Sequence, residues 1–321
     1  MKIEGNQTVL KRIPTDLFSF DYALSSRGKL GIPVPGIIEI YGQTHVGKST
    51  LAYHLASQLD PTGRVVLCDF EGIDIDYVQR VFEHGKFDGT LKIVDAIGDK
   101  GKVRSHEDML NDLTDEFYND EVSVGIVDSI GAITPIFEVE NDIEEGFGAK
   151  RAIIVSRFVR RISIPIRGCE KPKTLFVINH SHAVMGGGYG HQSSGGVALQ
   201  HAKTVSLYLR PKTADNIKTT DEVLAYVVEG QVEKLRYGGK GSKFQFVTIP
   251  GYGVRPHLSA VMDCVALGKA ERGTTVKIED KSYGFISKMV SADLNDEVEA
   301  FQDFHQILEG LRNGTGKSAL A

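Results

Sequence analysis

The sequence predicts an α/β protein in which a mostly parallel central β-sheet forms the main part and a small α/β appendage follows it. Three observations indicate this fold. Short apolar segments alternate with segments of helical spacing, as in parallel βαβ units. Several of the apolar segments end directly before a polar residue. Beyond about residue 255 the chain changes to a helical segment, a turn-rich segment and a final amphipathic helix.

The predicted elements follow one another in a regular order. Residues 37–40 form a buried-type strand, and residues 49–59 have helical spacing, with Leu51, Leu55 and Leu59 on one side. Four more apolar strands are predicted at residues 65–68, 122–127, 174–178 and 204–209. In the appendage, helices are predicted at residues 257–267 and 295–311, on either side of a turn-rich stretch at residues 269–288. The ends, residues 1–12 and 313–321, are predicted as a short N-terminal arm and a frayed tail.

The composition argues against a membrane protein and against a uniformly basic surface. Hydrophobic residues make up 41% and charged residues 25% of the 321 residues, and the net charge is −5. No apolar segment approaches the ~20 residues of a membrane span, and the N-terminus lacks the apolar segment of a secretory signal. Three cysteines without metal-like spacing indicate reduced thiols in the cytoplasm. An acidic chain can still bind nucleic acid where loops or assembly concentrate its positive groups.

Polar residues gather where the predicted strands end. In an open α/β sheet, ligands bind outside the carboxyl ends of the strands. One site is therefore expected to collect residues from distant parts of the sequence, namely Lys48, Asp69, Glu71, Asp128 and Asn179.

A P-loop motif lies between the first predicted strand and the first predicted helix. It comprises Gly42, Gln43, Thr44, His45, Val46, Gly47, Lys48, Ser49 and Thr50. Its glycines allow turns that expose successive N–H groups to phosphate, and the helix N-terminus adds a favourable dipole. Lys48 is placed to neutralise the β- and γ-phosphates, Ser49 to ligate Mg²⁺ and Thr50 to reach the α-phosphate. ATP and Mg²⁺ are therefore the predicted cofactors; the alternative is a glycine turn that arose by chance.

Two carboxylates complete the predicted chemistry. Asp128 ends one strand and, with a P-loop present, is predicted to hold the Mg²⁺ shell, whereas an isolated Asp in this position is often a helix cap. Glu71 follows another strand end, where a carboxylate beside the γ-phosphate can orient and deprotonate the attacking water. The residues alone leave open whether Glu71 is this base or a surface residue of a loop.

The chain resembles the RecA-type recombinases in three segments around this site. Residues 13–24, IPTDLFSFDYAL, resemble the segment that precedes the P-loop of that family. Residues 36–42, GIIEIYG, are similar to its entering strand, and residues 126–135, IVDSIGAITP, to its Walker B region. The resemblance implies a RecA-like P-loop ATPase core at residues 13–255 and a small C-terminal subdomain at residues 256–321.

Three local features resemble the phage branch of the family, typified by UvsX. They are Asn179-His180, the run VMGGG at residues 184–188, and VEKLR at residues 232–236 with SKF at residues 242–244. This likeness implies a phage origin and, with it, the cytoplasm of the host.

The resemblance also implies roles for individual residues near the nucleotide. Glu71 matches the catalytic base. Asn179 and His180 match the sensor between the γ-phosphate and a DNA-binding loop, although an ordinary loop histidine stays an alternative for His180. Tyr77 falls near the aromatic residue that stacks on adenine, or is a tyrosine that packs its helix.

Lys234 and Arg236 resemble basic groups that reach the ATP of a neighbouring subunit. They are two residues apart, so in a strand both side chains would project from the same face. No acidic partner is obvious beside them in the sequence, which suggests an anion opposite this face. The alternative is a pair of solvated surface charges.

Two DNA-binding loops are implied at residues 138–148 and 183–196. The expected DNA contacts are Phe147, Arg151, Met185, Gly186, Gly187, Gly188, Ser193, Ser194, Gly195 and Gly196. Glycine backbones let phosphate approach N–H donors, and apolar residues such as Phe147 and Met185 wedge between bases. The first loop is crowded with acidic residues, so positive charge for DNA is expected from the helix that follows it. A flexible lid without DNA contact is the alternative for the second loop.

The resemblance implies a DNA-dependent ATPase that binds single-stranded DNA, pairs it with homologous double-stranded DNA and exchanges strands. It also implies self-assembly into a filament or ring, with single-strand-binding and mediator proteins as further partners. Only about a dozen residues precede the matching segment, which puts filament formation through the usual N-terminal helix and strand in doubt. Two other functions stay open: a hexameric helicase or RecA-fold motor, and a recombination mediator or paralogue that lacks strand exchange.

Overall fold

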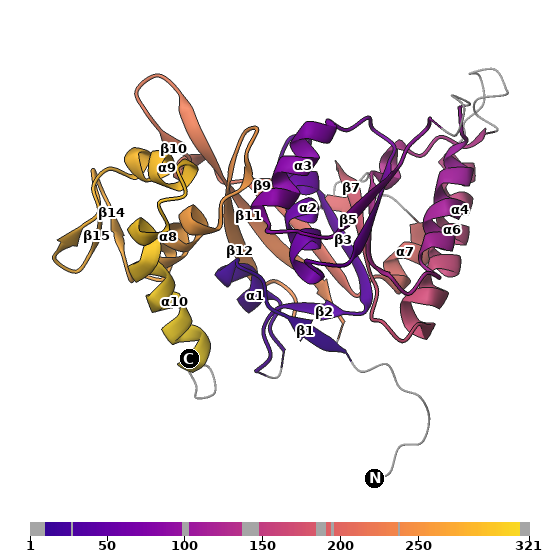
Figure 1. Cartoon of the computed structure of the whole chain (residues 1–321), viewed down its shortest axis with the longest axis horizontal. Helices are drawn as coiled ribbons and strands as arrows, with labels where there is room; N and C mark the ends of the chain where they lie inside the picture. The colour runs from indigo at the N-terminus through magenta and orange to yellow at the C-terminus, as the bar shows by residue number, and fades with distance from the viewer. Residues whose placement is uncertain are drawn as a thin grey trace, which may run out of the picture.

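A central β-sheet with helices on both faces runs through the part of the chain that the computed structural model describes (Figure 1). The described residues are 10–26, 28–97, 103–136, 148–183, 191–193, 196–236 and 238–314.

Within these residues, six parallel strands form the middle of the sheet. In spatial order they are β9 (Val205–Pro211), β3 (Gly36–Gly42), β7 (Thr174–Ala183), β6 (Val122–Asp128), β4 (Arg64–Asp69) and β5 (Thr90–Val94). The mostly parallel central sheet predicted from the sequence is therefore confirmed. The sequence prediction lacks β5, because this edge strand is largely half-buried and does not stand out as an apolar run.

Beyond β9 the sheet continues in antiparallel strands. β11 (Val223–Leu235) pairs with β9, β12 (Lys243–Ile249) pairs with β11, and β13 (Gly253–Val254) pairs with β12. Two short strands join from the side: β10 (Ile217–Lys218) pairs with β11, and β8 (His191–Ser193) pairs with β7. The sequence prediction also lacks these strands, because polar residues such as Glu229, Gln231 and Glu233 interrupt the apolar pattern of β11.

The pleat of the parallel strands supplies two apolar cores, one on each face of the sheet. On β3, Ile38 and Ile40 belong to one core and Ile37 belongs to the other. The first face is covered by α2 (Lys48–Leu59) and α3 (Ile75–His84), and the second by α4 (His106–Glu116), α6 (Gly148–Gly168) and α7 (Gly196–Ala202). Because both faces are covered, the parallel strands other than β5 are mostly apolar, which is why the sequence shows them clearly.

The N-terminal segment packs beside the sheet. β1 (Lys11–Ile13) pairs antiparallel with β2 (Ile32–Val34), and α1 (Phe18–Ala23) lies between them in sequence and packs against β12. The last two residues of the predicted N-terminal arm, Lys11 and Arg12, therefore belong to β1. Residues 1–9 lie outside the described residues.

The C-terminal part is a smaller α/β unit. It contains α8 (Pro256–Ala266), a three-stranded antiparallel sheet of β14 (Glu271–Arg272), β15 (Val276–Ile278) and β16 (Lys281–Ser282), α9 (Ile286–Leu294), the 3₁₀ turn η4 (Val298–Phe301) and α10 (Gln302–Gly314). A third apolar core joins these helices to Val227 and Val247 of the main sheet. The predicted appendage is confirmed, whereas the domain limits at residues 12 and 255 stay predictions.

Two details of this unit differ from the sequence prediction. The turn-rich stretch at residues 269–288 holds the three short strands and the beginning of α9. The last helix begins at Gln302 rather than near Asn295, because Asn295 is the C-cap of α9 and η4 intervenes. Residues 315–321, most of the tail predicted to fray, lie outside the described residues. Among the described helices, none combines the length and apolar character that a bilayer crossing requires.

Candidate active site

The P-loop connects the carboxyl end of β3 to the beginning of α2, as the sequence predicts. Gly47 is the N-cap of α2 and has a φ of 84°, a left-handed conformation that glycine adopts without strain. Gly42 needs to be glycine for another reason, because a Cβ atom there would lie 2.3 Å from the carbonyl oxygen of Leu209 on β9. The two glycines thus set the shape of the loop at both ends.

Lys48 is the first residue of α2 and is almost buried, with 7% of its surface exposed. Its Nζ atom donates a hydrogen bond to the carbonyl oxygen of Gln43 at 2.7 Å, so the side chain folds back over the loop. Burial lowers the pKa of Lys48, and the charges of Glu71 and Asp128 act in the opposite direction. An anion bound in the loop would favour the charged ammonium further.

A cavity of about 570 Å³ opens beside the loop and brings the predicted residues together. Its lining includes Thr44, His45, Val46, Gly47, Lys48, Ser49, Thr50, Glu71, Tyr77, Asp128 and His180. The opposite wall comes from the antiparallel part of the sheet and includes Pro211, Tyr226 and Thr248. Asp69 and Asn179 do not line this cavity, although both stand at the same edge of the sheet.

Asp69 shapes the loop that carries Glu71. Its carboxylate accepts hydrogen bonds from the backbone N–H groups of Glu71 at 3.0 Å, of Gly72 at 2.8 Å and of Ile73 at 2.9 Å. A carboxylate that accepts three backbone hydrogen bonds fixes the turn after β4. Asp69 therefore fixes the backbone that carries Glu71, and it does not itself line the cavity.

Asp128 is 3% exposed and meets the requirements of a cation ligand. Its Oδ2 atom accepts a hydrogen bond from the hydroxyl of Tyr53 at 2.5 Å, while Oδ1 is buried and has no hydrogen-bond donor among the described residues. Burial raises the pKa of Asp128, and hydrogen bonds from Tyr53 and Ser49 oppose this effect. Buried oxygen atoms of this kind are the ligands that Mg²⁺ prefers, so Ser49 and Asp128 fit the predicted ion.

Sequence reasoning missed Tyr53 at this position. It lies four residues after Ser49 on α2, and residues four apart share one face of a helix. That spacing, together with a helix that starts at the P-loop, is the signal that could have identified Tyr53 as the residue that orients the carboxylate of Asp128.

Glu71 is held by two side chains, one from Ser129 directly after β6 and one from His180 on β7. The hydroxyl of Ser129 donates a hydrogen bond to Oε1 of Glu71, and Nε2 of His180 lies 3.2 Å from the same oxygen. Burial raises the pKa of Glu71, but the hydrogen bonds from Ser129 and His180 and the nearby charge of Lys48 together bring it below the ordinary value. Glu71 is therefore an ionised, oriented carboxylate at the edge of the cavity, as a general base requires.

Asn179 is fully buried and positions its neighbour. Its Nδ2 atom donates a hydrogen bond to Oε1 of Glu39 at 3.1 Å, and its Oδ1 atom accepts the backbone N–H of His180 at 2.9 Å. Glu39 in turn pairs with Lys203, whose Nζ atom lies 2.5 Å from Oε2. Sequence reasoning missed this buried network, because Glu39 stands in the apolar run Ile-Ile-Glu-Ile and its partners are more than a hundred residues away.

Tyr77 belongs to α3 and forms part of the cavity wall. Its hydroxyl shares a hydrogen bond of 2.7 Å with Oγ1 of Thr50, which ties α3 to the start of α2. Burial raises the pKa of Tyr77. A position in the cavity wall is compatible with adenine stacking, which stays a prediction.

Lys234 and Arg236 lie outside the cavity and contact the carboxyl end of α7. The Nζ atom of Lys234 donates to the carbonyl oxygen of Gln200 at 2.6 Å, and Nη2 of Arg236 donates to the carbonyl oxygens of His201 and Ala202, the latter at 3.2 Å. The last carbonyl groups of a helix need such donors and carry partial negative charge. The helix end is therefore the negative partner that the sequence does not reveal, and the role toward a neighbouring subunit stays a prediction.

Most of the predicted DNA contacts lie outside the described residues, namely Phe147, Met185, Gly186, Gly187, Gly188, Ser194 and Gly195. Ser193 ends β8, and Gly196 begins α7 with a φ of 69°. Arg151 on α6 donates a hydrogen bond through Nη1 to the carbonyl oxygen of Gly131 at 3.2 Å, just after β6. The DNA-binding roles of these residues stay predictions.

Comparisons with known proteins find similarity to RecA proteins over most of the chain. Residues 1–240 match the model of the RecA N-terminal domain. Protein RecA of Desulforapulum autotrophicum is 25% identical over 327 aligned residues, which cover 96% of this chain and 84% of that protein. Protein RecA of Campylobacter lari is 27% identical over 258 residues, or 75% of this chain and 67% of that protein. The chloroplastic DNA repair protein recA homolog 1 of Arabidopsis thaliana is 25% identical over 296 residues, or 86% of this chain and 60% of that protein.

Proposed function

The chain belongs to the RecA family, and from this premise we propose that it is an ATP-dependent DNA recombinase. It would hydrolyse ATP to ADP and phosphate, bind single-stranded DNA, pair it with homologous double-stranded DNA and exchange strands. The observation that carries the proposal is the meeting of Lys48, Glu71 and Asp128 at one cavity, from three different strand ends. The names of the RecA relatives and of the chloroplastic DNA repair protein support recombination or repair as the setting.

The first step is the binding of the triphosphate in the P-loop. Backbone N–H groups around Gly47 and the N-terminus of α2 face the phosphates, and Lys48 neutralises the β- and γ-phosphates. A Mg²⁺ ion held by Ser49 and Asp128 would supply further positive charge to the developing transition state. Tyr53 keeps the carboxylate of Asp128 oriented toward that position.

The second step is the attack of water on the γ-phosphorus atom. Glu71 accepts the proton of the water, the new bond forms to phosphorus, and the bond to the oxygen of ADP breaks. Ser129 and His180 hold the carboxylate in its ionised form, so it is ready to accept this proton near neutral pH. A positioned general base of this kind typically contributes about 10²–10⁴-fold to the rate.

The position of His180 supports a coupling between hydrolysis and DNA. β7 carries His180 beside Glu71 and ends at Ala183, where the second proposed DNA loop begins. DNA bound by that loop would shift the end of β7. Because His180 lies on β7, this shift would change the contact between His180 and Glu71. The resemblance to the family is the basis on which we propose the individual DNA contacts, namely Phe147, Arg151, Met185, Gly186, Gly187, Gly188, Ser193, Ser194, Gly195 and Gly196.

The proposed assembly is a filament or ring with ATP between subunits. Lys234 and Arg236 would then act on the neighbour's ATP while they hold α7, and Tyr77 would stack on adenine in its own subunit. Single-strand-binding and mediator proteins are the further proposed partners. The likeness to the phage branch typified by UvsX, and with it the host cytoplasm as location, stays a prediction from local features of the sequence.

The decisive experiment is a strand-exchange reaction between a circular single strand and a homologous linear duplex, with electron microscopy of the same mixture. Joint molecules together with helical filaments are the expected result. Closed rings that unwind duplex without homology would instead identify a motor. Nucleotide binding without strand exchange would identify a mediator.

A further inference from the structure

A buried carboxylate stands in the middle of β3, the strand that leads to the P-loop. Glu39 is fully buried, and its two oxygen atoms have different partners. Oε1 accepts a hydrogen bond from Nδ2 of Asn179 at 3.1 Å, whereas Oε2 accepts from Nζ of Lys203 at 2.5 Å and from the hydroxyl of Ser206 at 2.7 Å. A buried ion pair is often no more stable than an apolar pair of similar volume, so the charge in this strand calls for another explanation.

On one side Glu39 leads to the proposed general base. The Oδ1 atom of Asn179 accepts the backbone N–H of His180 at 2.9 Å. Nε2 of His180 in turn lies 3.2 Å from Oε1 of Glu71. A continuous chain of contacts therefore joins Glu39 to the base, although Glu39 does not line the nucleotide cavity.

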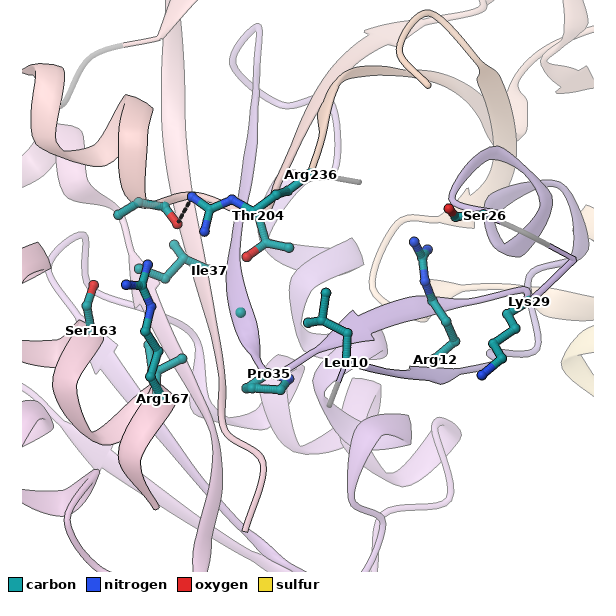
Figure 2. A pocket seen from close by; sticks show the side chains of 13 residues that line it. Leu10, Arg12, Ser26, Lys29, Pro35, Ile37, Ser163, Arg167, Thr204 and Arg236 are labelled. Atoms are coloured by element: carbon teal, nitrogen blue, oxygen red, sulfur yellow. Dashed lines mark hydrogen bonds between the residues drawn. The ribbon is translucent and has the colours of Figure 1, made fainter. Parts of the chain in front are cut away.

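On the other side the network ends at the carboxyl end of α7. Lys203 directly follows this helix, and its backbone N–H donates to the carbonyl oxygen of Leu199 at 3.0 Å. Thr204 is held at both polar groups of its backbone, because its N–H donates to the carbonyl oxygen of Ile37 at 2.7 Å and its carbonyl oxygen accepts the N–H of Arg236 at 2.8 Å. Figure 2 shows Thr204 next to Arg236, whose side chain bonds to the end of α7. The buried ammonium group of Lys203 therefore extends from a fixed backbone.

The two charges decide the direction of the hydrogen bonds in this network. An ammonium group can only donate, and a carboxylate can only accept. Oε2 of Glu39 is taken by Lys203, and Ser206, which accepts from Lys203 at 3.1 Å, donates to the same oxygen. Oε1 is left for a donor, so the NH₂ group of Asn179 must face Glu39. The carbonyl oxygen of Asn179 then remains for the N–H of His180.

We propose that Glu39 and Lys203 are positioning residues for ATP hydrolysis. Their charges fix the orientation of the Asn179 amide, and this amide holds the backbone of His180 so that the imidazole stays beside Glu71. An apolar pair at the two positions would not select between the two orientations of an amide, which differ only in the exchange of the NH₂ group and the oxygen. These roles rest on the proposed function, in which Glu71 is the general base.

Glu39→Gln tests this selection, because it preserves the shape of the side chain but offers both a donor and an acceptor. Lys203 takes the oxygen of the new amide, so the new NH₂ group faces Asn179 and the Asn179 amide turns over. The N–H of His180 then loses its acceptor. We expect kcat to fall by at least about tenfold, as for one unsatisfied buried donor, with KM for ATP unchanged within about twofold. The acid limb of kcat/KM should move to higher pH, because His180 no longer lowers the pKa of Glu71.

Adding Lys203→Met should reverse the defect. Without the ammonium group the new amide can turn its oxygen toward Asn179, so we expect the double variant Glu39→Gln, Lys203→Met to regain most of kcat and the acid limb of the wild type. A purely structural pair predicts the opposite, since the double variant has lost more of the native contacts. A double variant no more active than Glu39→Gln would overturn the proposal.

The matched control is Asp293→Asn. It breaks another buried ion pair, that of Asp293 on α9 with Arg255 at the start of α8, which has no part in the network of Glu39. This variant should lower the melting temperature without moving the acid limb.

Hydrogen–deuterium exchange at the N–H of His180 gives a measure that does not depend on hydrolysis. We expect exchange to be at least about tenfold faster in Glu39→Gln and to slow again when Lys203→Met is added. Unchanged exchange would overturn the proposal. Turnover that survives Glu71→Gln would instead refute the proposed base and leave the role of Glu39 toward His180 in place.

Thermal unfolding of each variant serves as the folding control. If Glu39→Gln fails to fold, the pair Glu39→Gln, Lys203→Met is compared with Glu39→Leu, Lys203→Met. Both pairs are uncharged, but only the first offers Asn179 an oxygen. Equal exchange at His180 and equal turnover in these two variants would overturn the proposal.

Discussion

The Nε2 atom of His180 lies 3.2 Å from Oε1 of Glu71, although the two residues are 109 positions apart in the sequence. The same oxygen accepts the hydroxyl hydrogen of Ser129, which follows a third strand. One carboxylate oxygen is thus positioned by the ends of β6 and β7 and carried by the loop after β4. If Glu71 is the general base proposed above, a movement of the end of β7 would change its protonation, because His180 lies on that strand.

We expect Glu71→Gln to keep ATP binding and to lower the turnover by about 10²–10⁴-fold, because an amide cannot accept the proton of the attacking water. Turnover is measured by ADP release, and binding by the fluorescence of a labelled nucleotide. Lys48→Ala is the matched variant and is expected to lose both, since the phosphates lose their main counter-charge. If Glu71→Gln lost binding as well, Glu71 would be a structural residue.

We expect His180→Ala to move the acid limb of kcat/KM to higher pH. Burial raises the pKa of Glu71, and the hydrogen bonds and positive charge around it lower the pKa. Without His180 one of the lowering contributions is lost, the pKa of Glu71 rises, and the base is protonated at a higher pH than in the wild type. The profile is recorded between about pH 4 and 8.

The control for this profile is His201→Ala, a histidine outside the nucleotide cavity. It should keep the acid limb of the wild type. An acid limb that stays in place in His180→Ala, or that moves to lower pH, would show that His180 does not act on Glu71.

We expect Lys203→Met to lower the free energy of unfolding by about 3–5 kcal/mol, because it leaves a buried carboxylate without its partner. The side chain of Lys203 is 5% exposed and that of Glu39 is 0% exposed, and the Nζ atom of Lys203 lies 2.5 Å from Oε2 of Glu39. Glu39 also accepts a hydrogen bond from the hydroxyl of Ser206 at 2.7 Å. Adding Glu39→Gln should therefore restore part of the loss, since the neutral amide can still bond with Asn179 and Ser206. Urea unfolding measures the free energy of unfolding of both variants. If Lys203→Met lowered it by less than about 1 kcal/mol, the Lys203–Glu39 pair would contribute no more than a surface salt bridge.

We expect the double variant Lys234→Ala, Arg236→Ala to lose DNA-stimulated ATP hydrolysis, by up to about 10³–10⁵-fold if the pair acts like an arginine finger. A second double variant, Lys234→Gln with Arg236→Gln, keeps N–H donors for the end of α7 but has no positive charge. Loss of activity in both variants indicates action on the neighbour's ATP. Loss in the alanine variant alone, with a lower melting temperature, would show that the pair only caps α7.

A mixing experiment gives an independent measure of the same role. The alanine double variant has an intact P-loop, whereas Lys48→Ala has an intact basic pair. Mixed together, they should recover part of the activity at the boundaries where the two intact halves meet. Equal inactivity of the mixture and of its separate components would contradict action between subunits.

The sequence predicts five of the six parallel strands described above, because burial on two faces leaves a mostly apolar run on each of these five, whereas it misses the half-buried β5. It predicts the half-exposed elements poorly. β11 alternates polar and apolar residues, and α9 follows three strands of two or three residues each. Such elements depend on neighbours that the linear pattern does not contain.

The candidate site divides in the same way. The P-loop, Asp128 and Glu71 are predictable, since each follows a strand and all strand ends meet at one edge. Ser129, Glu39 and Lys203 are not, because their importance arises from hydrogen bonds across long sequence separations. Tyr53 is an intermediate case, since its spacing from Ser49 marks it but its partner Asp128 is 75 positions away. For Lys234 and Arg236 the sequence shows no negative partner nearby. Their partners in the structure are backbone carbonyl groups at the end of α7, which side-chain types in the sequence do not reveal.

The central place of β3 has a consequence for the order in which the newly made chain can fold. β3 ends at Gly42, but its two neighbours in the sheet, β7 and β9, begin only at Thr174 and Val205. At 5–20 residues per second, a ribosome needs on the order of ten seconds to make the intervening chain. During that time the isoleucines of β3 have neither of their strand partners. We therefore expect nascent chains arrested before residue 174 to bind general chaperones, and chains released beyond residue 211 to escape them.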